Sequence, residues 1–197
     1  MARRGDHSRE EIRRMALDAA EALVAVEGYK GFSARKVASA IHYTVGTLYL
    51  VFENLDDLVL QVNGRTLDKL FDWLSARRGE AEDPEAALLA LSNAYIAYAA
   101  IESPRWSMLF DYTAEKGDDL PEWYQRKLGR VFGLVEAALR PLAREELEIQ
   151  RASRVLWASV HGICILRIRQ RMNPVGNQDA EGMVRMLIEN FLRGFCA

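Results

Sequence analysis

Cysteine and long apolar runs are both scarce in this sequence. Only two cysteines, Cys164 and Cys196, occur among 197 residues, which excludes a disulfide scaffold. No apolar run approaches the roughly 18 residues that a membrane span requires, and no segment of signal-peptide type follows the arginine-rich N-terminus. We therefore expect a cytoplasmic protein without membrane association, long enough to fold without a disulfide or a metal.

A strong net charge is also lacking. The 26 lysines and arginines nearly balance the 28 acidic residues, which leaves a net charge of −2. The whole molecule is therefore not a general binder of polyanions, and any contact with nucleic acid must come from a local patch. The best candidate is the N-terminal arm, whose first fourteen residues hold five arginines and three acidic residues.

Motifs of catalysis and of cofactor binding are missing as well. The sequence has no phosphate-binding loop, dinucleotide fingerprint, zinc-helix motif or nucleophile elbow. We therefore expect neither an enzyme nor a cofactor. His161 and Cys164 have the spacing of a metal-ligand pair on one helix face, but two ligands without a third do not define a metal site.

Proline is confined to one part of the chain, since all five prolines lie beyond residue 83. Apolar residues recur at helical spacing, and alternating β-branched segments bounded by hairpin turns are absent. The sequence is therefore predicted to be all-α, with about nine helices. Their expected ranges are 8–27, 33–40, 44–51, 54–76, 84–101, 105–112, 121–140, 146–171 and 179–195.

The first of these helices has the clearest local signals. Ser8 is the expected N-cap, Glu11 completes a capping box, and Gly28 ends the helix. The apolar spacing predicts that its core face consists of Ile12, Met15, Ala16, Ala19, Leu23 and Val26.

Residues 31–58 carry the strongest functional signal. Ser33 can cap one short helix, and Thr44 can cap a second one after a three-residue break. The small Ala38 would let the two helices approach closely. This pattern is typical of a helix-turn-helix motif, and the competing interpretation is an ordinary pair of helices in a bundle.

In a helix-turn-helix the second helix enters the major groove of DNA. The Thr44 hydroxyl and the first amides of that helix would face phosphate. Thr47 and Tyr49 can donate hydrogen bonds to phosphates or base edges, and Gly46 lets the backbone approach the duplex.

Residues across this motif match a known pattern, namely Gly31-Phe32, Val37-Ala38, Thr44-Val45-Gly46-Thr47-Leu48-Tyr49, Phe52 and Leu58. The pattern resembles the DNA-binding domain of the TetR (tetracycline repressor) family over about residues 8–60. The resemblance implies a homodimer with a three-helix DNA-binding domain at 1–60, its motif at about 32–51. It also implies a C-terminal helical domain at 61–197 for inducer binding and dimerisation.

The residues expected to contact DNA lie in the arm and in the two short helices. They are Arg3, Arg4, Ser33, Arg35, Lys36, Thr44, Val45, Gly46, Thr47, Tyr49 and Leu50. The arm, with Arg35 and Lys36, is expected to supply much of the electrostatic attraction, and each phosphate contact adds about 0.9 to the salt slope.

Four positions depart from the family pattern. His42 stands where a turn glycine is usual, and Leu55 where a phosphate-binding lysine is common. Leu50 and Val51 stand where histidine or aromatic residues are frequent. Residues 1–60 also hold 8 basic residues against 9 acidic ones. These departures support an alternative function, in which the chain is a helical ligand-binding or scaffolding protein with a weakened DNA-binding face.

The C-terminal half carries a second, looser resemblance. The run Trp157-Ala158-Ser159-Val160-His161-Gly162 resembles the Trp-x-x-x-His-Gly motif of one TetR-family class (WHG), and Pro104-Arg105-Trp106-Ser107-Met108-Leu109-Phe110 is similar to its aromatic segment. The resemblance implies a cavity for a small apolar or aromatic molecule, whereas ordinary core packing is the alternative. The predicted lining is Tyr95, Tyr98, Trp106, Phe110, Trp123, Trp157 and His161.

The last two predicted helices carry more apolar surface than a small monomer needs to bury. Paired across a two-fold axis, they would form a four-helix bundle. The leading hypothesis is a ligand-responsive transcriptional repressor. It would bind a palindromic double-stranded DNA operator as a homodimer and respond to a small-molecule inducer or other effector.

Overall fold

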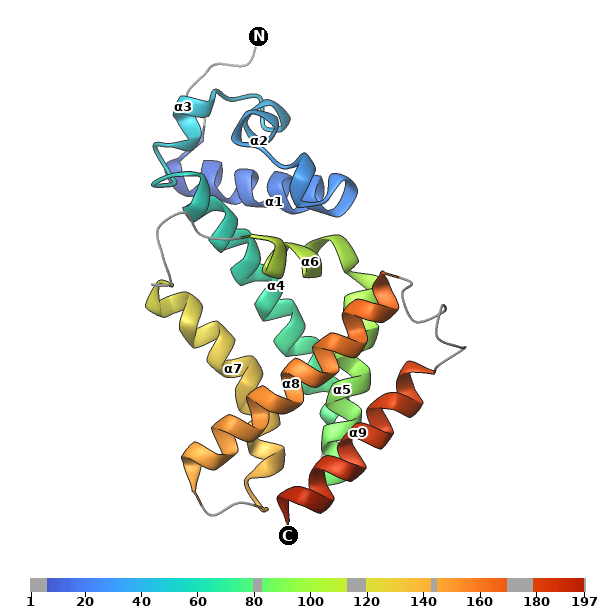
Figure 1. The fold of residues 1–197 in the computed structure, drawn as a ribbon. Coiled ribbons are helices and arrows are strands. Elements are labelled where there is room, and N and C mark those ends of the chain that lie inside the picture. The colour runs from blue at the N-terminus through green and yellow to red at the C-terminus, as the bar shows by residue number, and fades with distance from the viewer. Residues whose placement is uncertain (1–6, 80–82, 113–119, 143–144, 170–178, 197) are drawn as a thin grey trace. The chain divides into compact units, whose positions relative to one another are not determined.

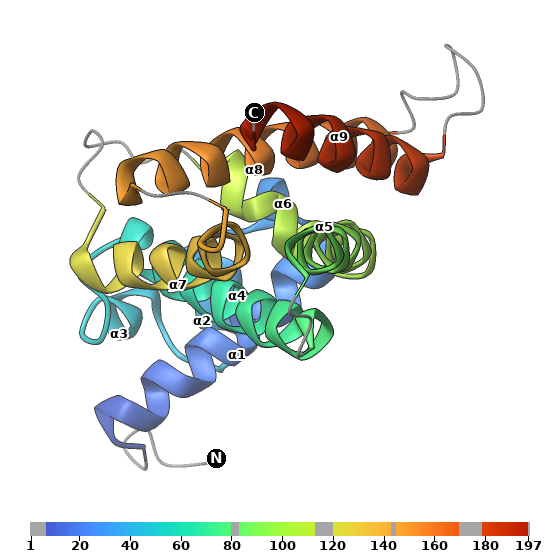
Figure 2. The same cartoon turned by 90° about the horizontal axis from the view of Figure 1, so that it is seen from below.

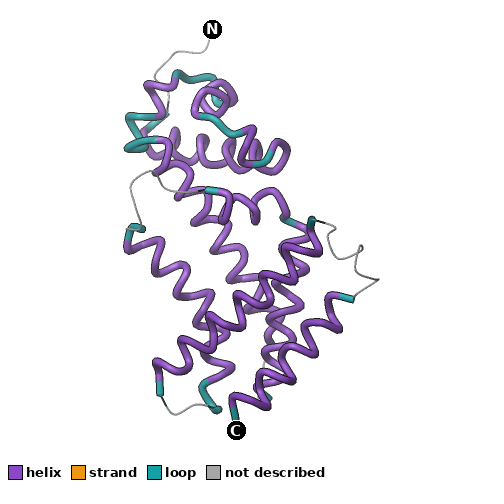
Figure 3. Tube along the Cα trace, viewed as in Figure 1, coloured by secondary structure: helices purple, strands orange, loops and turns teal. Residues whose placement is uncertain are grey.

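The computed structural model describes residues 7–79, 83–112, 120–142, 145–169 and 179–196. Within these ranges all regular structure is helical and no strand occurs (Figures 1 and 3). The prediction of an all-α chain is therefore confirmed. Arg3 and Arg4, which the sequence analysis assigned to DNA contact, lie outside the described residues.

The described residues form nine α-helices, all close to the predicted ranges, and one short 3-10 helix that was not predicted. They are α1 (Arg9–Glu27), η1 (Tyr29–Gly31), α2 (Ala34–Ala40), α3 (Val45–Leu48), α4 (Leu55–Arg78), α5 (Pro84–Ile101), α6 (Ser103–Asp111), α7 (Glu122–Leu139), α8 (Glu146–Ile168) and α9 (Ala180–Phe195).

Side-chain caps explain why the early helices begin where they do. The Ser8 hydroxyl accepts a hydrogen bond from the Glu11 amide, and the Glu11 carboxylate accepts one from the Ser8 amide at 2.6 Å. This backbone hydrogen bond lowers the pKa of Glu11. Asp83 caps α5 in one direction only, since its carboxylate accepts a hydrogen bond from the Ala86 amide, and Pro84 lies in the first turn. The capping box satisfies amides that an uncapped helix leaves open.

The core face of α1 differs from the predicted one. Its buried residues are Ile12, Ala16, Leu17, Ala20 and Val24. Val26 is instead 86% exposed, so the prediction for that residue was wrong. Small and apolar residues occupy several faces of α1, and the contacts with α2 and α3 select which face is buried.

The helices form two compact units, and the division falls inside α4. The first unit contains residues 1–66 and 104–124, and the second contains residues 67–103 and 125–197. The sequence analysis had placed the whole of 61–197 in one C-terminal domain. In the structure, the described residues 104–112 and 120–124 belong with the N-terminal helices, and the Met108 side chain of α6 is fully buried in their core.

In the second unit α5, α8 and α9 pack against one another. Figure 2 shows α8 and α9 lying side by side. Buried side chains from all three helices form the core, among them Leu88, Leu91, Leu156, Val160, Val184 and Ile188. This unit is a helical framework whose interior is almost entirely apolar.

Candidate functional site

The turn between α2 and α3 gives the first candidate site its shape. His42 has a φ of 61°, in the left-handed region that most residues other than glycine avoid. The Tyr43 amide donates a hydrogen bond to the Ala38 carbonyl at 2.9 Å, which closes the turn. The structure therefore places His42 at a position where a turn glycine would be unstrained.

Both short helices begin at the predicted caps. The Ser33 hydroxyl accepts a hydrogen bond from the Lys36 amide at 3.3 Å, and the Thr44 hydroxyl accepts one from the Thr47 amide at 3.2 Å. The Thr44 and Thr47 hydroxyls lie 3.0 Å apart and share a hydrogen bond. The two threonines therefore fix the first turn of α3 before any ligand is present.

Burial divides α3 and the turn after it into an inner and an outer face. Leu48 and Phe52 are 1% and 2% exposed and anchor the segment in the core of the first unit. Tyr49 and Leu50 are 46% and 64% exposed. We call α3 and the turn that follows it, residues 45–52, the recognition segment.

Arg13 of α1 supports the recognition segment from behind. Its guanidinium lies 5.1 Å from the centre of the Phe52 ring and donates hydrogen bonds to the Val51 carbonyl and to Gln61 Oε1, the latter at 2.9 Å. Sequence analysis grouped Arg13 with the basic arm, but these contacts direct it inward. Its position one helical turn before the buried Leu17 is a signal that could have shown this.

The remaining predicted DNA-contacting residues differ in their surroundings. Lys36 forms an ion pair with Glu27, and both side chains are partly exposed. Arg35, Thr44 and Gly46 are exposed, whereas Ser33, Val45 and Thr47 are partly buried. The structure thus brings the α2 and α3 residues together on one short stretch of the first unit. In the sequence no lysine or arginine occurs from residue 37 to residue 64.

The second candidate site is a cavity inside the second unit, with a volume of about 50 Å³. Side chains from α4, α5, α7, α8 and α9 line it, namely Leu74, Leu88, Leu91, Ser92, Tyr95, Val131, Phe132, Val135, Leu156, Trp157, Val160 and Ile188. Its lining is apolar except for the hydroxyl groups of Ser92 and Tyr95 and the indole nitrogen of Trp157. The cavity can hold a few waters but is well below the roughly 300 Å³ of a typical ligand pocket.

A histidine lies behind two aromatic residues of the cavity wall. His161 Nδ1 and the Tyr95 hydroxyl are hydrogen bonded at 2.9 Å. The Trp157 ring stacks on His161, with ring centres 5.1 Å apart, and Phe132 packs edge-on against Trp157. Burial lowers the pKa of His161. This residue is therefore held as a neutral partner of Tyr95 near neutral pH.

The predicted ligand residues separate into two groups. Tyr95 and Trp157 line the cavity, and His161 contacts both of them. Tyr98 is buried beside Trp73 and does not line the cavity. The other three, Trp106, Phe110 and Trp123, belong to the first unit and do not line the cavity either.

Metal-ligating groups do not gather around His161. In the described part of the chain no group of three or more His, Cys, Asp or Glu residues could hold a metal ion. The neighbouring Cys164 is buried, and burial raises the pKa of its thiol to about 12. The chemistry of the cavity is therefore that of apolar contact with a few neutral polar groups.

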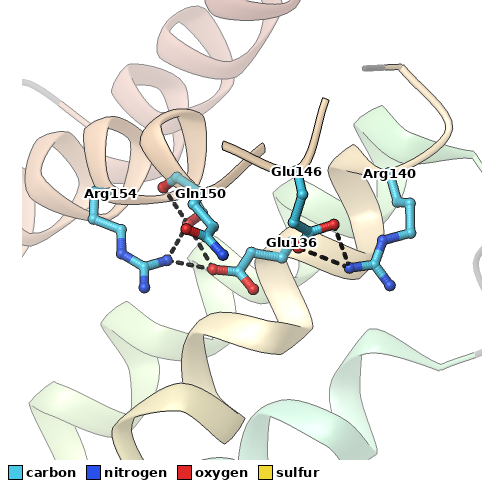
Figure 4. Close-up of polar contacts among 6 residues, drawn as sticks. Glu136, Arg140, Glu146, Gln150 and Arg154 are labelled. Atoms are coloured by element: carbon cyan, nitrogen blue, oxygen red, sulfur yellow. Dashed lines mark hydrogen bonds and ion pairs between the residues drawn. The ribbon is translucent and has the colours of Figure 1, made fainter. Parts of the chain in front are cut away.

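An ion-pair cluster joins α7 to α8 next to the cavity (Figure 4). Glu136 of α7 accepts hydrogen bonds from Arg154 and, at 3.3 Å, from the Ser153 hydroxyl. The Arg154 guanidinium also lies 4.2 Å from the centre of the Phe132 ring, which lines the cavity. Arg140, just beyond α7, pairs with Glu146 at 3.1 Å. Sequence reasoning missed this cluster because its partners come from different helices.

The outer side of α8 and α9 forms an open groove of about 560 Å³. Its apolar lining includes Leu147, Val155, Phe191 and Phe195, and its rim includes Glu145, Glu148 and Arg151. Leu147 and Val155 are 57% and 54% exposed.

No single described helix is long and apolar enough to cross a membrane, although α5 and α6 together reach that length and composition across a sharp bend.

The short capped α3, the turn before it and the separate helical unit define a helix-turn-helix protein with a second, cavity-bearing unit. Residues 16–62 match the model of bacterial regulatory proteins of the tetR family, and residues 88–191 match the tetracyclin repressor-like C-terminal domain. The chain therefore belongs to the TetR family of bacterial transcriptional regulators. No curated protein matches the sequence significantly.

Solved structures share the fold at low sequence identity. A protein of unknown function from Rhodococcus sp. RHA1 aligns over 99% of this chain and 100% of its own, with a TM-score of 0.76 and 17% identity. A TetR-family regulator from Streptomyces coelicolor covers 94% and 99%, with a TM-score of 0.65 and 22% identity. FadR from Bacillus subtilis in complex with stearoyl-CoA covers 92% and 98%, with a TM-score of 0.67 and 16% identity.

Proposed function

We propose that this TetR-family regulator is a ligand-responsive repressor that binds a palindromic operator as a homodimer. The observation that carries the proposal is the recognition segment, which is capped by Thr44, anchored by Leu48 and Phe52, and supported by Arg13. Such a segment can enter a major groove without first becoming ordered, so DNA binding would not carry the conformational-entropy cost of ordering it. Its place of action would be the cytoplasm.

The basic groups around the recognition segment would supply the electrostatic part of binding. We propose Arg35 and Lys36, together with Arg3 and Arg4 of the arm, as phosphate contacts. Ser33, Thr44 and Thr47 would position the segment, with the exposed Tyr49 donating to phosphate. Because the recognition segment itself carries no charge, the salt slope of operator binding should depend mainly on the arm and on α2.

A homodimer would use the apolar groove on α8 and α9. Leu147 and Val155 of the groove are more than half exposed, and so is Met186 elsewhere on α9, which is unfavourable for large apolar groups on neighbouring helices of a monomer. A two-fold interface would cover them as a four-helix bundle. It would also present two recognition segments to successive major grooves about 34–36 Å apart.

The effector would enter the cavity of the second unit. The apolar walls favour an apolar molecule, and the Tyr95–His161 pair offers it a polar neighbour at one side. A cavity of about 50 Å³ has to expand to admit such a molecule, so binding would shift the lining helices. FadR, which shares the fold, is in complex with stearoyl-CoA, so stearic acid and stearoyl-CoA are suitable first probes.

The first experiment is selection of bound duplexes from a random DNA pool, at low and then physiological salt. We expect a palindrome whose half-site centres lie about 10 base pairs apart or at a multiple of that spacing. Tyr49→Ala should weaken binding to the selected operator about tenfold at fixed salt, because the variant loses a hydrogen bond to a charged phosphate. Val26→Ala, at an exposed residue of α1, is the matched control and should bind like the wild type.

The effector is tested on the same operator complex. Addition of an effector should change operator affinity about 5- to 150-fold, the usual range of allosteric coupling. If neither stearic acid nor stearoyl-CoA changes the affinity, an acyl chain is the wrong ligand class. Tryptophan fluorescence of Trp157 in a protein lacking its other three tryptophans would report occupancy of the cavity directly.

A second candidate function rests on the scarcity of positive charge near the recognition segment. Residues 37–64 contain no lysine or arginine, and Lys36 is paired with Glu27. In this alternative the chain is a helical ligand-binding or scaffolding protein with a weakened DNA-binding face. Recovery of no duplex by folded, dimeric protein at low salt would favour it over repression.

A further inference from the structure

The recognition segment lacks the side chains that usually distinguish three of the four bases. Direct readout of guanine uses Arg or Lys, that of adenine uses Asn or Gln, and that of cytosine uses Asp or Glu. None of these six residue types occurs from His42 to Phe52. If this segment reads base edges, it must do so through hydroxyl groups and apolar contact.

Backbone hydrogen bonds place one large apolar side chain on the outer face. The Leu50 amide donates to the Thr47 carbonyl at 3.2 Å, and the Phe52 amide donates to the Leu48 carbonyl at 2.9 Å. These bonds continue the helical turn past the end of α3. Leu50 therefore lies one turn beyond Gly46 and Thr47, on the same face as they do.

Burial separates Leu50 from the three apolar residues that anchor the segment. Leu48, Val51 and Phe52 are between 1% and 7% exposed and belong to the core, whereas Leu50 is 64% exposed. An isolated exposed leucine on an ordinary surface would need no explanation. Here the side chain stands on the face that would approach DNA, one helical turn beyond Gly46, where the absence of a side chain would allow close approach.

We propose that Leu50 selects thymine in each operator half-site by contact with its C5-methyl group. That methyl is the apolar group that base pairs present in the major groove, and an aliphatic side chain is a suitable partner for it. The inference rests on the proposed function, because it requires that the recognition segment enters the groove. It predicts an operator in which each half-site has a thymine that cannot be exchanged for uracil without loss.

The test uses the full-length protein and the operator found by selection. Each thymine of one half-site is replaced singly by deoxyuridine, which removes the methyl group and keeps the hydrogen-bonding edge. Affinity is then measured by fluorescence anisotropy at fixed salt. We expect about a fourfold loss at one thymine or two adjacent ones, which is the effect of burying one methyl group, and no loss at the others.

Protein variants then assign the methyl contact to Leu50. Leu50→Ala should bind the thymine and uracil operators equally, because the leucine that contacts the methyl is gone. Val26→Ala, an aliphatic truncation at an exposed site of the same unit, should keep the fourfold preference. Thr47→Ser removes the competing methyl of Thr47 and should keep the preference as well. A Leu50→Ala protein that still prefers thymine would overturn the proposal.

A change of specificity gives an independent measurement. Leu50→Gln should lose the thymine preference and gain a preference for adenine, because glutamine can bond to the adenine edge. An unchanged thymine preference in Leu50→Gln contradicts the proposal. An operator bound tightly but without any uracil-sensitive position refutes only the role of Leu50. A wild-type protein that binds no duplex refutes the proposed function, and the role of Leu50 with it.

Discussion

The two units differ in how their interiors are filled. In the first unit the recognition segment is anchored by Leu48 and Phe52, and Arg13 covers the Phe52 ring and bonds to the backbone behind it. In the second unit long helices leave a cavity of about 50 Å³ beside Trp157. The recognition segment is therefore held by close contacts on its inner side, whereas the helices of the second unit leave a small space between them.

Truncation of one aromatic residue in each unit tests the difference in packing most directly. Phe52→Ala removes a buried ring and should lower the free energy of unfolding of the first unit by about 4 kcal/mol. Trp157→Ala removes a partly buried ring that already borders a cavity, and should lower that of the second unit by about 2 kcal/mol. Urea denaturation followed by amide hydrogen exchange would measure the free energy of unfolding of each unit separately. Equal losses would show that the second interior is packed as tightly as the first.

The turn before α3 provides the next largest effect. His42 is in the left-handed region, where a β-branched residue is strained by about 1–2 kcal/mol. His42→Val should therefore lower the stability of the first unit by about that amount, whereas His42→Gly should leave it unchanged or raise it. Thermal unfolding of both variants measures the difference. Equal stability of the valine and glycine variants would contradict the strained turn.

The ion-pair cluster in Figure 4 allows a smaller test of packing in the second unit. Glu136→Gln weakens the pairing with Arg154, whose side chain is half exposed. Solvent screening limits the expected loss of stability to about 1 kcal/mol. Because Arg154 also covers Phe132 of the cavity wall, the variant should bind an apolar fluorescent probe more strongly. Arg140→Gln, in the exposed pair with Glu146, is the control and should change probe binding little.

The smallest effect concerns pH. Burial lowers the pKa of His161 below its usual 6.5, so the unfolded chain binds more protons than the folded one below pH 6.5. Stability is therefore present above that pH and is lost as pH falls through 6.5 toward the folded-state pKa. Urea denaturation at pH 7.5 and 5.5 should show a larger loss for the wild type than for His161→Gln. An equal loss in both proteins would mean that His161 does not contribute.

Local signals made the N-terminal helices predictable. Ser8, Ser33 and Thr44 act on amides within three residues of themselves, so the sequence alone was sufficient to place these helix starts. The all-α fold and the family followed from the same kind of information. The exposed position of Val26 was not predictable in this way, because contacts with distant helices choose the buried face of α1.

The candidate sites were predicted less completely, for the same physical reason. The resemblance of residues 157–162 to a family motif named Trp157 and His161 together, and their rings stack in the structure, but the motif could not show that Tyr95 of α5 is the hydrogen-bond partner of His161. Neither could it show that the segment 104–124 belongs to the first unit, which separates Trp106 and Phe110 from the cavity. Contacts between residues that are far apart in the sequence depend on helix packing, which no short motif encodes.

The two cysteines differ so much in reactivity that the protein carries a natural labelling site. Burial raises the pKa of the Cys164 thiol to about 12 and covers its side chain, so this cysteine is un-ionised at pH 7 and shielded from reagents. Cys196 lies exposed just beyond α9. A maleimide dye should therefore attach to Cys196 alone, without mutation of either cysteine. Energy transfer between dyes on two copies would then report how the ends of α9 move relative to one another when DNA or effector binds.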